Sequence, residues 1–455
     1  MSAGGQDKPA CFIIERSFPL NSIKRYIAVF VIVACLLPIG VSAAEPLSFA
    51  NELEAAEAFA DMLERGENTL RLNAPSDFDY MLCYRYLSML YRDAYVFEYI
   101  PSTVNAYIRI VYNDKDKHLK AEAEAERLAG ELLNESMSDY EKYFAIHSYL
   151  LENCEYDMHA ALNQATETGD AFSAYGALVD GKAVCDGISA AFAMICRYAG
   201  LPCIYVASPE MNHSWNAVLY KGEVMYIDTT FDLTGGTADE YFIVGEQQLS
   251  SDHQWDAYLV KNLTDDIWDN RFIGAYSLSR VGGLFRGSDK GWELDRQPTR
   301  AEAAIMLVRF LGLESEALNG ENVSEMPFKD INPAHAPYIA LLYKLGLTNG
   351  TSETTFSPDK AVSLNDYMTF MLRALGYSES EAQFAWESAP EDALGLGIID
   401  GLEYDYISSL VFDRGVMAYV SLLTLTASDP NGIPLCDRLV QAGVIEQKKL
   451  EEIFF

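Results

Sequence analysis

The stretch Gly181-Lys-Ala-Val-Cys-Asp-Gly-Ile-Ser189 decides how the middle of the chain is interpreted. Beyond Cys185, apolar residues recur at three- and four-residue steps: Ile188, Phe192, Ile195 and Ala199. This spacing predicts an amphipathic helix that begins at Cys185 and ends before Gly200 and Pro202. Because a helix N-terminus presents free N–H groups and the positive end of the helix dipole, it favours a nucleophilic thiolate.

A β-hairpin is predicted downstream of this helix. Its two turn residues are Lys221-Gly222, and its strands are His213-Ser-Trp-Asn-Ala-Val-Leu-Tyr220 and Glu223-Val-Met-Tyr-Ile-Asp228. In that register Tyr220 pairs with Glu223, so His213 lies diagonal to Asp228 on the same face. The spacing therefore indicates a catalytic set in which Cys185 is the nucleophile, His213 is the base and Asp228 orients the base.

Three segments in this order resemble the motifs of the transglutaminase-like superfamily, which has a papain-like α+β fold. They are Val184-Cys185-Asp-Gly187, His213-Ser-Trp-Asn216 and Tyr226-Ile-Asp228-Thr-Thr-Phe-Asp232. The resemblance covers residues 139–255 and includes a downstream Asp252-His253 pair. Three residues depart from those usual in the family, namely Ala183, Ser214 and Phe231. All three are expected to affect packing around the site more than its chemistry, and an altered turn before Cys185 is left open for Ala183.

The resemblance implies roles for further residues around the site. Trp215 and Asn216 are expected to shape the site and bind substrate, and Tyr175 is a third candidate, whose hydroxyl would help to form an oxyanion hole. The alternative for Tyr175 is simple packing. His147 is predicted to be a core histidine because it lies in an apolar helix pattern, and His253 is predicted to be structural because such a triad needs one imidazole. No metal or other cofactor is predicted, since the cysteines lack the spacing of zinc ligands.

The composition of the chain limits its partners and its location. The 455 residues include 67 acidic and 33 basic ones, a formal charge of −34, which argues against nucleic acid or an anionic membrane surface as partner. Residues 1–44 read as a signal peptide, with Lys24-Arg25, an apolar run and the small residues Val41-Ser42-Ala43. A retained anchor and a lipoprotein cleavage site at Cys35 are the alternatives. We therefore expect an exported protein.

The remaining regions are assigned from their periodicity. Residues 45–138 are expected to form a helical and mixed N-terminal region with one strand pair, and residues 256–270 a linker. Three similar units follow over residues 271–427, each with a glycine-bounded turn, an aromatic-led loop and an apolar helix. Because one such unit cannot bury its own apolar face, the three are expected to stack. Residues 428–455 are expected to form one C-terminal helix.

These units resemble S-layer homology modules, and Gln297-Pro-Thr-Arg-Ala-Glu302 is similar to the family's sugar-contacting motif. The resemblance implies that Thr299, Arg300 and Glu302 bind a cell-wall polysaccharide. Only the first unit keeps the motif, because the second has Ser363-Leu-Asn-Asp366 and the third Asp413-Arg414-Gly415.

Together the patterns predict an α+β papain-like core followed by an all-α module of three S-layer homology repeats. The predicted function is that of an exported, wall-attached cysteine enzyme that acts on amide bonds of a peptide or protein, as a peptidase or amidase or by amide transfer. The alternative is a catalytically inactive binding or scaffold protein at the wall. No nucleic acid is expected as partner, and no membrane once the signal is removed.

Overall fold

The computed structural model describes residues 47–454 except for 65–66, 68, 74–77, 92–94, 101–105, 113, 164–168, 236–238, 289 and 320–325. The predicted signal peptide at residues 1–44 lies outside the described residues. The chain forms two compact units, residues 1–263 and 264–455. Among the described residues, no helix combines the length and the apolar character needed to cross a lipid bilayer.

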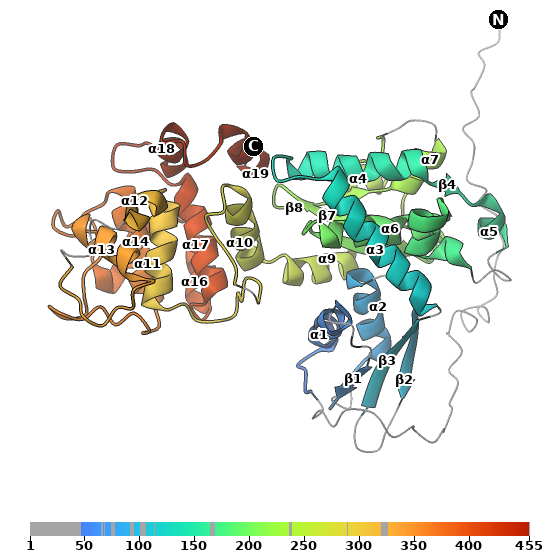
Figure 1. Cartoon of the computed structure of the whole chain (residues 1–455), viewed down its shortest axis with the longest axis horizontal. Coiled ribbons are helices and arrows are strands. Elements are labelled where there is room, and N and C mark those ends of the chain that lie inside the picture. Colours follow the sequence, from blue (N-terminus) through green and yellow to red (C-terminus); the bar gives the residue numbers. More distant parts are fainter. Residues whose placement is uncertain are drawn as a thin grey trace, which may run out of the picture. The chain divides into compact units, whose positions relative to one another are not determined.

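The N-terminal region of the first unit combines two helices with a small antiparallel sheet (Figure 1). Its elements are α1 (Glu52–Glu64), β1 (Thr69–Leu72), α2 (Tyr80–Leu90), β2 (Tyr95–Ile100) and β3 (Ala106–Tyr112). The sheet has the order β1-β3-β2, so the region contains three strands where the sequence predicted one pair. The additional strand, β1, is only four residues long, too short for its periodicity to stand out.

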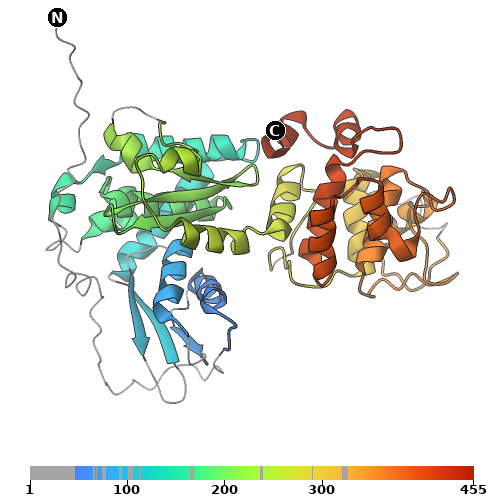
Figure 2. The same ribbon diagram turned by 180° about the vertical axis from the view of Figure 1, so that it is seen from behind.

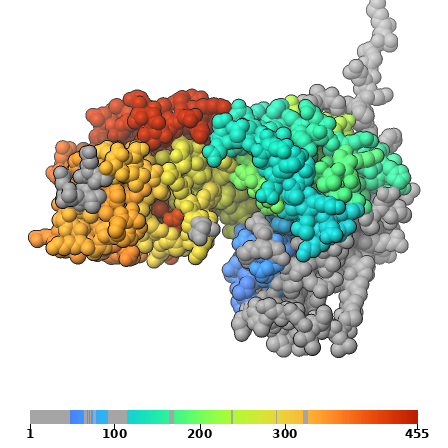
Figure 3. Space-filling view, in the orientation of Figure 1, coloured from blue at the N-terminus to red at the C-terminus, as the bar shows by residue number. Residues whose placement is uncertain are grey.

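The centre of the first unit is α6 (Cys185–Tyr198), in which ten of fourteen residues are buried. It packs against the antiparallel sheet of β6 (Cys203–Ser208), β7 (His213–Tyr220) and β8 (Glu223–Ile227), which Figure 2 shows from behind. It also contacts α3 (Lys115–Leu132) and α4 (Asp139–Asn153), which lie at the surface of this unit in Figure 3. Helix α6 is thus enclosed by a sheet and two helices, and it carries Cys185 at its first position.

Shorter elements connect these parts and surround the start of α6. A two-stranded parallel pair joins the segment after α4 to the segment before α6. The short elements are β4 (Glu155–Tyr156), α5 (Met158–Leu162), η2 (Asp170–Phe172), η3 (Gly176–Asp180), β5 (Lys182–Ala183), α7 (Thr229–Gly235) and α8 (Glu246–Leu249).

The hairpin of β7 and β8 has the register predicted from the sequence. Tyr220 pairs with Glu223, and the pairing continues to Asn216 opposite Ile227. The two turn residues, Lys221 and Gly222, both have positive φ, at 53° and 76°. Such a turn matches the right-handed twist of the flanking strands. The prediction of a two-residue turn at this place is confirmed.

The second unit is built from helices joined by glycine-containing turns. The helices are α10 (Asn270–Arg280), α11 (Arg300–Phe310), α12 (Glu314–Leu318), α13 (Ala336–Lys344), α14 (Leu364–Leu375), η5 (Trp386–Ser388), α15 (Ala389–Gly395), α16 (Gly401–Ser409), α17 (Arg414–Thr426), α18 (Leu435–Gln441) and α19 (Gln447–Phe454). The three apolar helices that the repeat pattern predicted are α11, α14 and α17, and they contribute to one hydrophobic core.

Two boundaries differ from the sequence prediction. The expected linker contains α9 (Ala257–Ile267), and the division between the two units falls within this helix. The expected single C-terminal helix is two helices, α18 and α19, which Gly443 separates with φ of 70°. A residue at positive φ cannot continue a right-handed helix, so the chain breaks there.

Candidate active site

Cys185 is the first residue of α6, as the apolar periodicity predicted. Val184 precedes it as the N-cap in an extended conformation, and Cys185 is buried at 6% exposure. The first N–H groups of a helix have no acceptor within the helix, so they can stabilise a negative charge that develops beside Cys185 by donating hydrogen bonds to it.

A close approach of another segment fixes the first turn of α6. The Val184 N–H donates to the Ala171 carbonyl at 2.9 Å. A Cβ added to Gly187 would lie 2.6 Å from that carbonyl oxygen and 2.8 Å from the Ser173 carbonyl oxygen. Glycine at this position therefore allows residues 171–173 to lie directly against the turn that carries Cys185.

Ala183, for which the sequence left an altered turn open, lies before this turn without a positive φ. It lies in β5 with its side chain fully buried, and its carbonyl accepts a hydrogen bond from the Asp157 N–H at 2.8 Å. The left-handed conformation belongs to Gly181, with φ of 67°. Because an extended residue tolerates any side chain that fits, alanine is accommodated at position 183.

His213 lies between Cys185 and Asp228. Its Nε2 is 2.6 Å from Oδ2 of Asp228, so Nδ1 is the ring nitrogen that remains for Cys185, which also interacts with the ring. Burial opposes a charge on this ring, but the Asp228 carboxylate and Cys185 outweigh burial and raise the pKa of His213 to about 10. The imidazole is therefore protonated at neutral pH and presents a cation to the cysteine.

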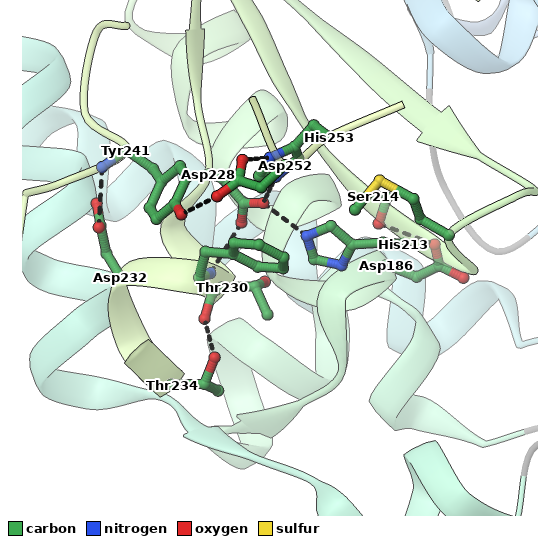
Figure 4. A network of polar contacts seen from close by, with 12 residues as sticks. Asp186, His213, Ser214, Asp228, Thr230, Asp232, Thr234, Tyr241, Asp252 and His253 are labelled. Carbon is green, nitrogen blue, oxygen red and sulfur yellow. Dashed lines mark hydrogen bonds and ion pairs between the residues drawn. The ribbon is translucent and has the colours of Figure 1, made fainter. Parts of the chain in front are cut away.

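Asp228 is fully buried at the end of the hairpin, where α7 begins. Its Oδ1 accepts the Phe231 N–H at 2.9 Å, and its Oδ2 faces two imidazoles, those of His213 and His253 (Figure 4). Burial alone would raise the pKa of Asp228. The charge and hydrogen bond of His213, together with the hydrogen bond from His253, instead hold that pKa well below its usual range.

His253 reaches the site from the segment after α8. Its Nε2 lies 3.0 Å from Oδ2 of Asp228, and its Nδ1 lies 2.7 Å from Oδ1 of Asp252. Its side chain is fully buried. The sequence assigned His253 a structural role because one imidazole is enough for a triad. The only signal in the sequence was the Asp252-His253 pair itself, since no periodic spacing relates it to the hairpin.

The ligand-type atoms of His213, Asp228 and His253 lie within 4.8 Å of one another, close enough to hold a metal ion. The two nitrogen–oxygen separations, 2.6 and 3.0 Å, are hydrogen-bond distances. We therefore interpret this group as a hydrogen-bonded network.

Trp215 and Asn216 are buried among the residues that form the site, so a direct contact with substrate stays a prediction. They are 0% and 1% exposed, because β7 is covered on both faces. The Trp215 ring packs against the rings of His213 and His253, with centroids 5.7 and 5.0 Å away. Asn216 donates from Nδ2 to the Ser189 carbonyl of α6 at 3.0 Å. Trp215 therefore helps to fix the two imidazole rings, and Asn216 ties β7 to α6.

Two of the residues that depart from the family pattern have clear places in the structure. Phe231 packs against both imidazoles, with its ring centroid 4.7 Å from that of His213 and 4.5 Å from that of His253. Ser214 donates from its hydroxyl to Asp186 Oδ1 at 3.0 Å, which links β7 to the residue next to Cys185 (Figure 4). Tyr205 of β6 donates to the same carboxylate oxygen.

Tyr175 and His147 contact other partners than Cys185. The Tyr175 ring packs on the hydrophobic core, with the Lys117 ammonium 5.3 Å from its centroid. His147 is fully buried, with Nδ1 3.0 Å from the Thr229 hydroxyl and Nε2 3.1 Å from Asp232 Oδ2. These contacts agree with the structural role predicted for His147, and substrate binding by Tyr175 stays a prediction.

In the second unit, the three residues predicted to bind wall polymer serve the start of α11. Thr299 and Glu302 form a capping box, in which Glu302 N–H donates to Thr299 Oγ1 at 3.2 Å and Thr299 N–H to Glu302 Oε2 at 2.8 Å. Arg300 is 8% exposed and donates to the carbonyls of Phe356 and Asn349 at 3.0 and 3.1 Å. In this conformation Arg300 ties the start of α11 to the segment of the second predicted unit, and polysaccharide binding by Thr299, Arg300 and Glu302 stays a prediction.

Arg414, in the third predicted unit, makes contacts similar to those of Arg300. It is 7% exposed and donates to the carbonyls of Trp292 and Arg286 at 3.0 and 3.2 Å. Each guanidinium also lies over a phenylalanine ring, Phe356 for Arg300 and Phe285 for Arg414. The third unit therefore keeps the arginine of the first, although the surrounding motif differs.

Comparisons with known proteins agree with these two parts of the chain. Residues 126–229 match the profile of the Transglutaminase-like superfamily, and residues 327–365 match that of the S-layer homology domain. A cell surface protein of Thermoanaerobacter kivui is 29% identical over 147 residues, which are 32% of this chain and 18% of that protein. Kyphoscoliosis peptidase of Mus musculus is 32% identical over 118 residues, 23% of this chain and 17% of that protein.

The human Kyphoscoliosis peptidase is 30% identical over 125 residues, 24% of this chain and 18% of that protein. The chain thus spans less than a fifth of the length of each of these relatives. The crystal structure of a TGase aligns over 44% of this chain and 63% of its own chain at 16% identity, with a TM-score of 0.24, too low to support an argument. The chain carries a transglutaminase-like domain and an S-layer homology domain.

Proposed function

We propose that this protein is a cell-surface cysteine enzyme that cleaves or transfers amide bonds of peptides or proteins. The observation that supports this most is the alignment of Cys185, His213 and Asp228, with Cys185 at a helix N-terminus and the His213–Asp228 distance at 2.6 Å. The relatives named as a peptidase and as a cell surface protein agree with the two halves of the proposal.

In the proposed reaction the Cys185 thiolate attacks the carbonyl carbon of a substrate amide. The backbone N–H of Cys185 has no acceptor within its own helix. It is therefore free of intrahelical bonding and suited to donate a hydrogen bond to the oxyanion. The protonated His213 then gives its Nδ1 proton to the leaving nitrogen as the C–N bond breaks, which leaves a thioester on Cys185. Asp228 keeps the His213 Nε2 proton in a hydrogen bond throughout and so holds the ring in place.

The thioester can react with water or with an amine. With water, His213 takes one proton, the C–S bond breaks, and the products are a carboxylic acid and the free enzyme. With an amine, the product is a new amide. We propose hydrolysis as the main reaction, because water is the default nucleophile.

The test compares the wild type with Cys185→Ala on casein and on a peptidoglycan digest. We expect turnover by the wild type and none by the variant, with the same melting temperature for both, because the thiol is small and its removal leaves the backbone contacts in place. Turnover by Cys185→Ala would overturn the cysteine mechanism. If no protein or peptide is turned over and iodoacetamide labels all cysteines alike, the alternative of an inactive wall-bound scaffold is favoured.

We further propose that the second unit attaches the enzyme to a cell-wall polysaccharide. The S-layer homology match at residues 327–365 supports this attachment. The full-length chain should sediment with purified cell walls, and removal of the wall polysaccharide should release it. Equal sedimentation with stripped walls would contradict the attachment.

A further inference from the structure

Asp228 has more hydrogen-bond partners than the orientation of one base requires. Its Oδ2 lies 2.6 Å from His213 Nε2 and 3.0 Å from His253 Nε2, and its Oδ1 accepts the Phe231 N–H. All of this occurs in a site where Asp228 is fully buried. A buried carboxylate is costly unless its oxygens are satisfied by donors, so each of these donors contributes to keeping Asp228 ionised.

The His253 imidazole also contacts a second carboxylate, that of Asp252. Nδ1 of His253 lies 2.7 Å from Oδ1 of Asp252, so both ring nitrogens of His253 face carboxylate oxygens (Figure 4). Both separations are hydrogen-bond distances, so each ring nitrogen of His253 has a carboxylate partner. Asp252 is further bound by the Tyr241 hydroxyl, which donates to Oδ2.

Packing fixes the His253 ring in this orientation. Its centroid lies 5.0 Å from that of Trp215, 4.5 Å from that of Phe231 and 5.4 Å from that of Tyr241. Trp215 and Phe231 also contact the His213 ring. The two imidazole rings, whose centroids are 5.9 Å apart, are therefore held by the same aromatic side chains.

We propose that His253, held by Asp252, is a positioning residue for the His213–Asp228 pair. It donates a hydrogen bond to Asp228 Oδ2 that does not depend on His213, and it keeps that oxygen directed at His213 Nε2 while His213 exchanges the proton on Nδ1. His253 contacts the same carboxylate oxygen of Asp228 as His213 does, and its role in the proposal is to act through Asp228 and not on the substrate. This inference rests on the proposed amide-bond chemistry of the same site.

The central variant is His253→Phe, which keeps a ring among these aromatic side chains and removes both donors. It should lower kcat per titrated active site on the order of 10–100-fold with little change in KM, as expected when a partner that orients a reacting group is lost. His253→Gln, which can still donate one hydrogen bond, should recover part of the loss. His159→Phe, the same substitution at an exposed position, should leave kcat unchanged.

A double-mutant cycle separates positioning from a general contribution to the fold. If His253 acts through Asp228, then His253→Phe should lower kcat little further in an Asp228→Asn background. Both changes break the same chain of hydrogen bonds from His253 through Asp228 to His213. A structural residue would instead give the same factor in both backgrounds. Equal factors, or a kcat for His253→Phe equal to the wild type, would overturn the proposal.

A second measurement keeps the inference separate from the proposed function, because it needs no substrate. The rate constant for alkylation of Cys185 by iodoacetamide at neutral pH reports on the cysteine–imidazolium pair directly. His253→Phe should slow this alkylation, and His253→Gln should slow it less. If the wild type turns over no amide but this order holds, the function fails and the role of His253 stands. An unchanged alkylation rate would refute the role of His253, whatever the activity.

Discussion

Nε2 of His213 lies 2.6 Å from Oδ2 of Asp228, and the two residues stand at the open end of one hairpin, on β7 and just after β8. The chain between them is only the hairpin itself, so the pair is set by a two-residue turn and its register. Cys185, in contrast, comes from a helix that must dock against this sheet. The His213–Asp228 pair is thus fixed by the register of one hairpin, whereas its alignment with Cys185 depends on how α6 packs against the sheet.

The activity of the enzyme should persist into the alkaline range. The pKa of His213 is raised to about 10, so the imidazolium needed to protonate the leaving group is lost only as the pH approaches that value. In Asp228→Asn the carboxylate that raises the pKa is gone, so the alkaline fall should move to lower pH and the rate should drop by about 10⁴-fold. The measurement is kcat/KM from about pH 5 to about pH 11 for both proteins. Identical alkaline limbs would show that Asp228 does not control His213.

The same pair should make stability depend on pH. Because the folded pKa of His213 lies above its unfolded value of about 6.5, its stabilising contribution is complete below that pH and is lost between about pH 6.5 and about pH 10. His213→Gln should therefore lower the free energy of unfolding most at acidic to neutral pH and least above pH 10. Urea unfolding of the full chain at several pH values measures this difference. His159→Gln, at an exposed position, is the control and should show no such trend.

Substitution of Gly187 should be far more damaging than that of an exposed helical glycine. A Cβ at position 187 would lie 2.6 and 2.8 Å from two backbone carbonyl oxygens, so Gly187→Ala must displace the first turn of α6 or residues 171–173. We expect a loss of about 1–3 kcal/mol in stability, together with loss of Cys185 reactivity. Gly130→Ala in α3 has no atom within 4 Å of the new Cβ and should be neutral or stabilising by up to about 1 kcal/mol. Similar effects of both changes in thermal unfolding would contradict the close approach.

The two buried arginines of the second unit should matter for its stability. Arg300 and Arg414 each donate to two carbonyls from a buried position, and a hydrogen bond that involves a charged group contributes about 1.5–3 kcal/mol. Arg300→Leu and Arg414→Leu should each lower the melting temperature in calorimetry of the full chain. Arg286→Leu removes a half-exposed ion pair with Glu314 and should cost only about 0–1 kcal/mol. An effect of Arg300→Leu as small as that of Arg286→Leu would mean that Arg300 is not a tie between repeats.

The sequence by itself determined the parts of the site that depend on near neighbours. The apolar spacing after Cys185 placed it at a helix start, and the Lys221-Gly222 turn set the register that brings His213 beside Asp228. Helix periodicity and turn chemistry are properties of a few consecutive residues, so they can be read before the chain folds. The order of the three motifs then indicated how these elements serve one site.

Only the tertiary structure decided which side chains are buried beneath the site and which distant residues complete it. Six consecutive residues of β7 are buried because α6 covers one face of the sheet and the segment after α8 covers part of the other, so the strand shows no alternation that would mark Trp215 and Asn216 as inaccessible. His253 meets Asp228 from 25 residues away, and Arg300 meets the Phe356 carbonyl from 56 residues away. Contacts between residues so far apart leave no periodic pattern in the sequence, because they depend on how whole elements pack.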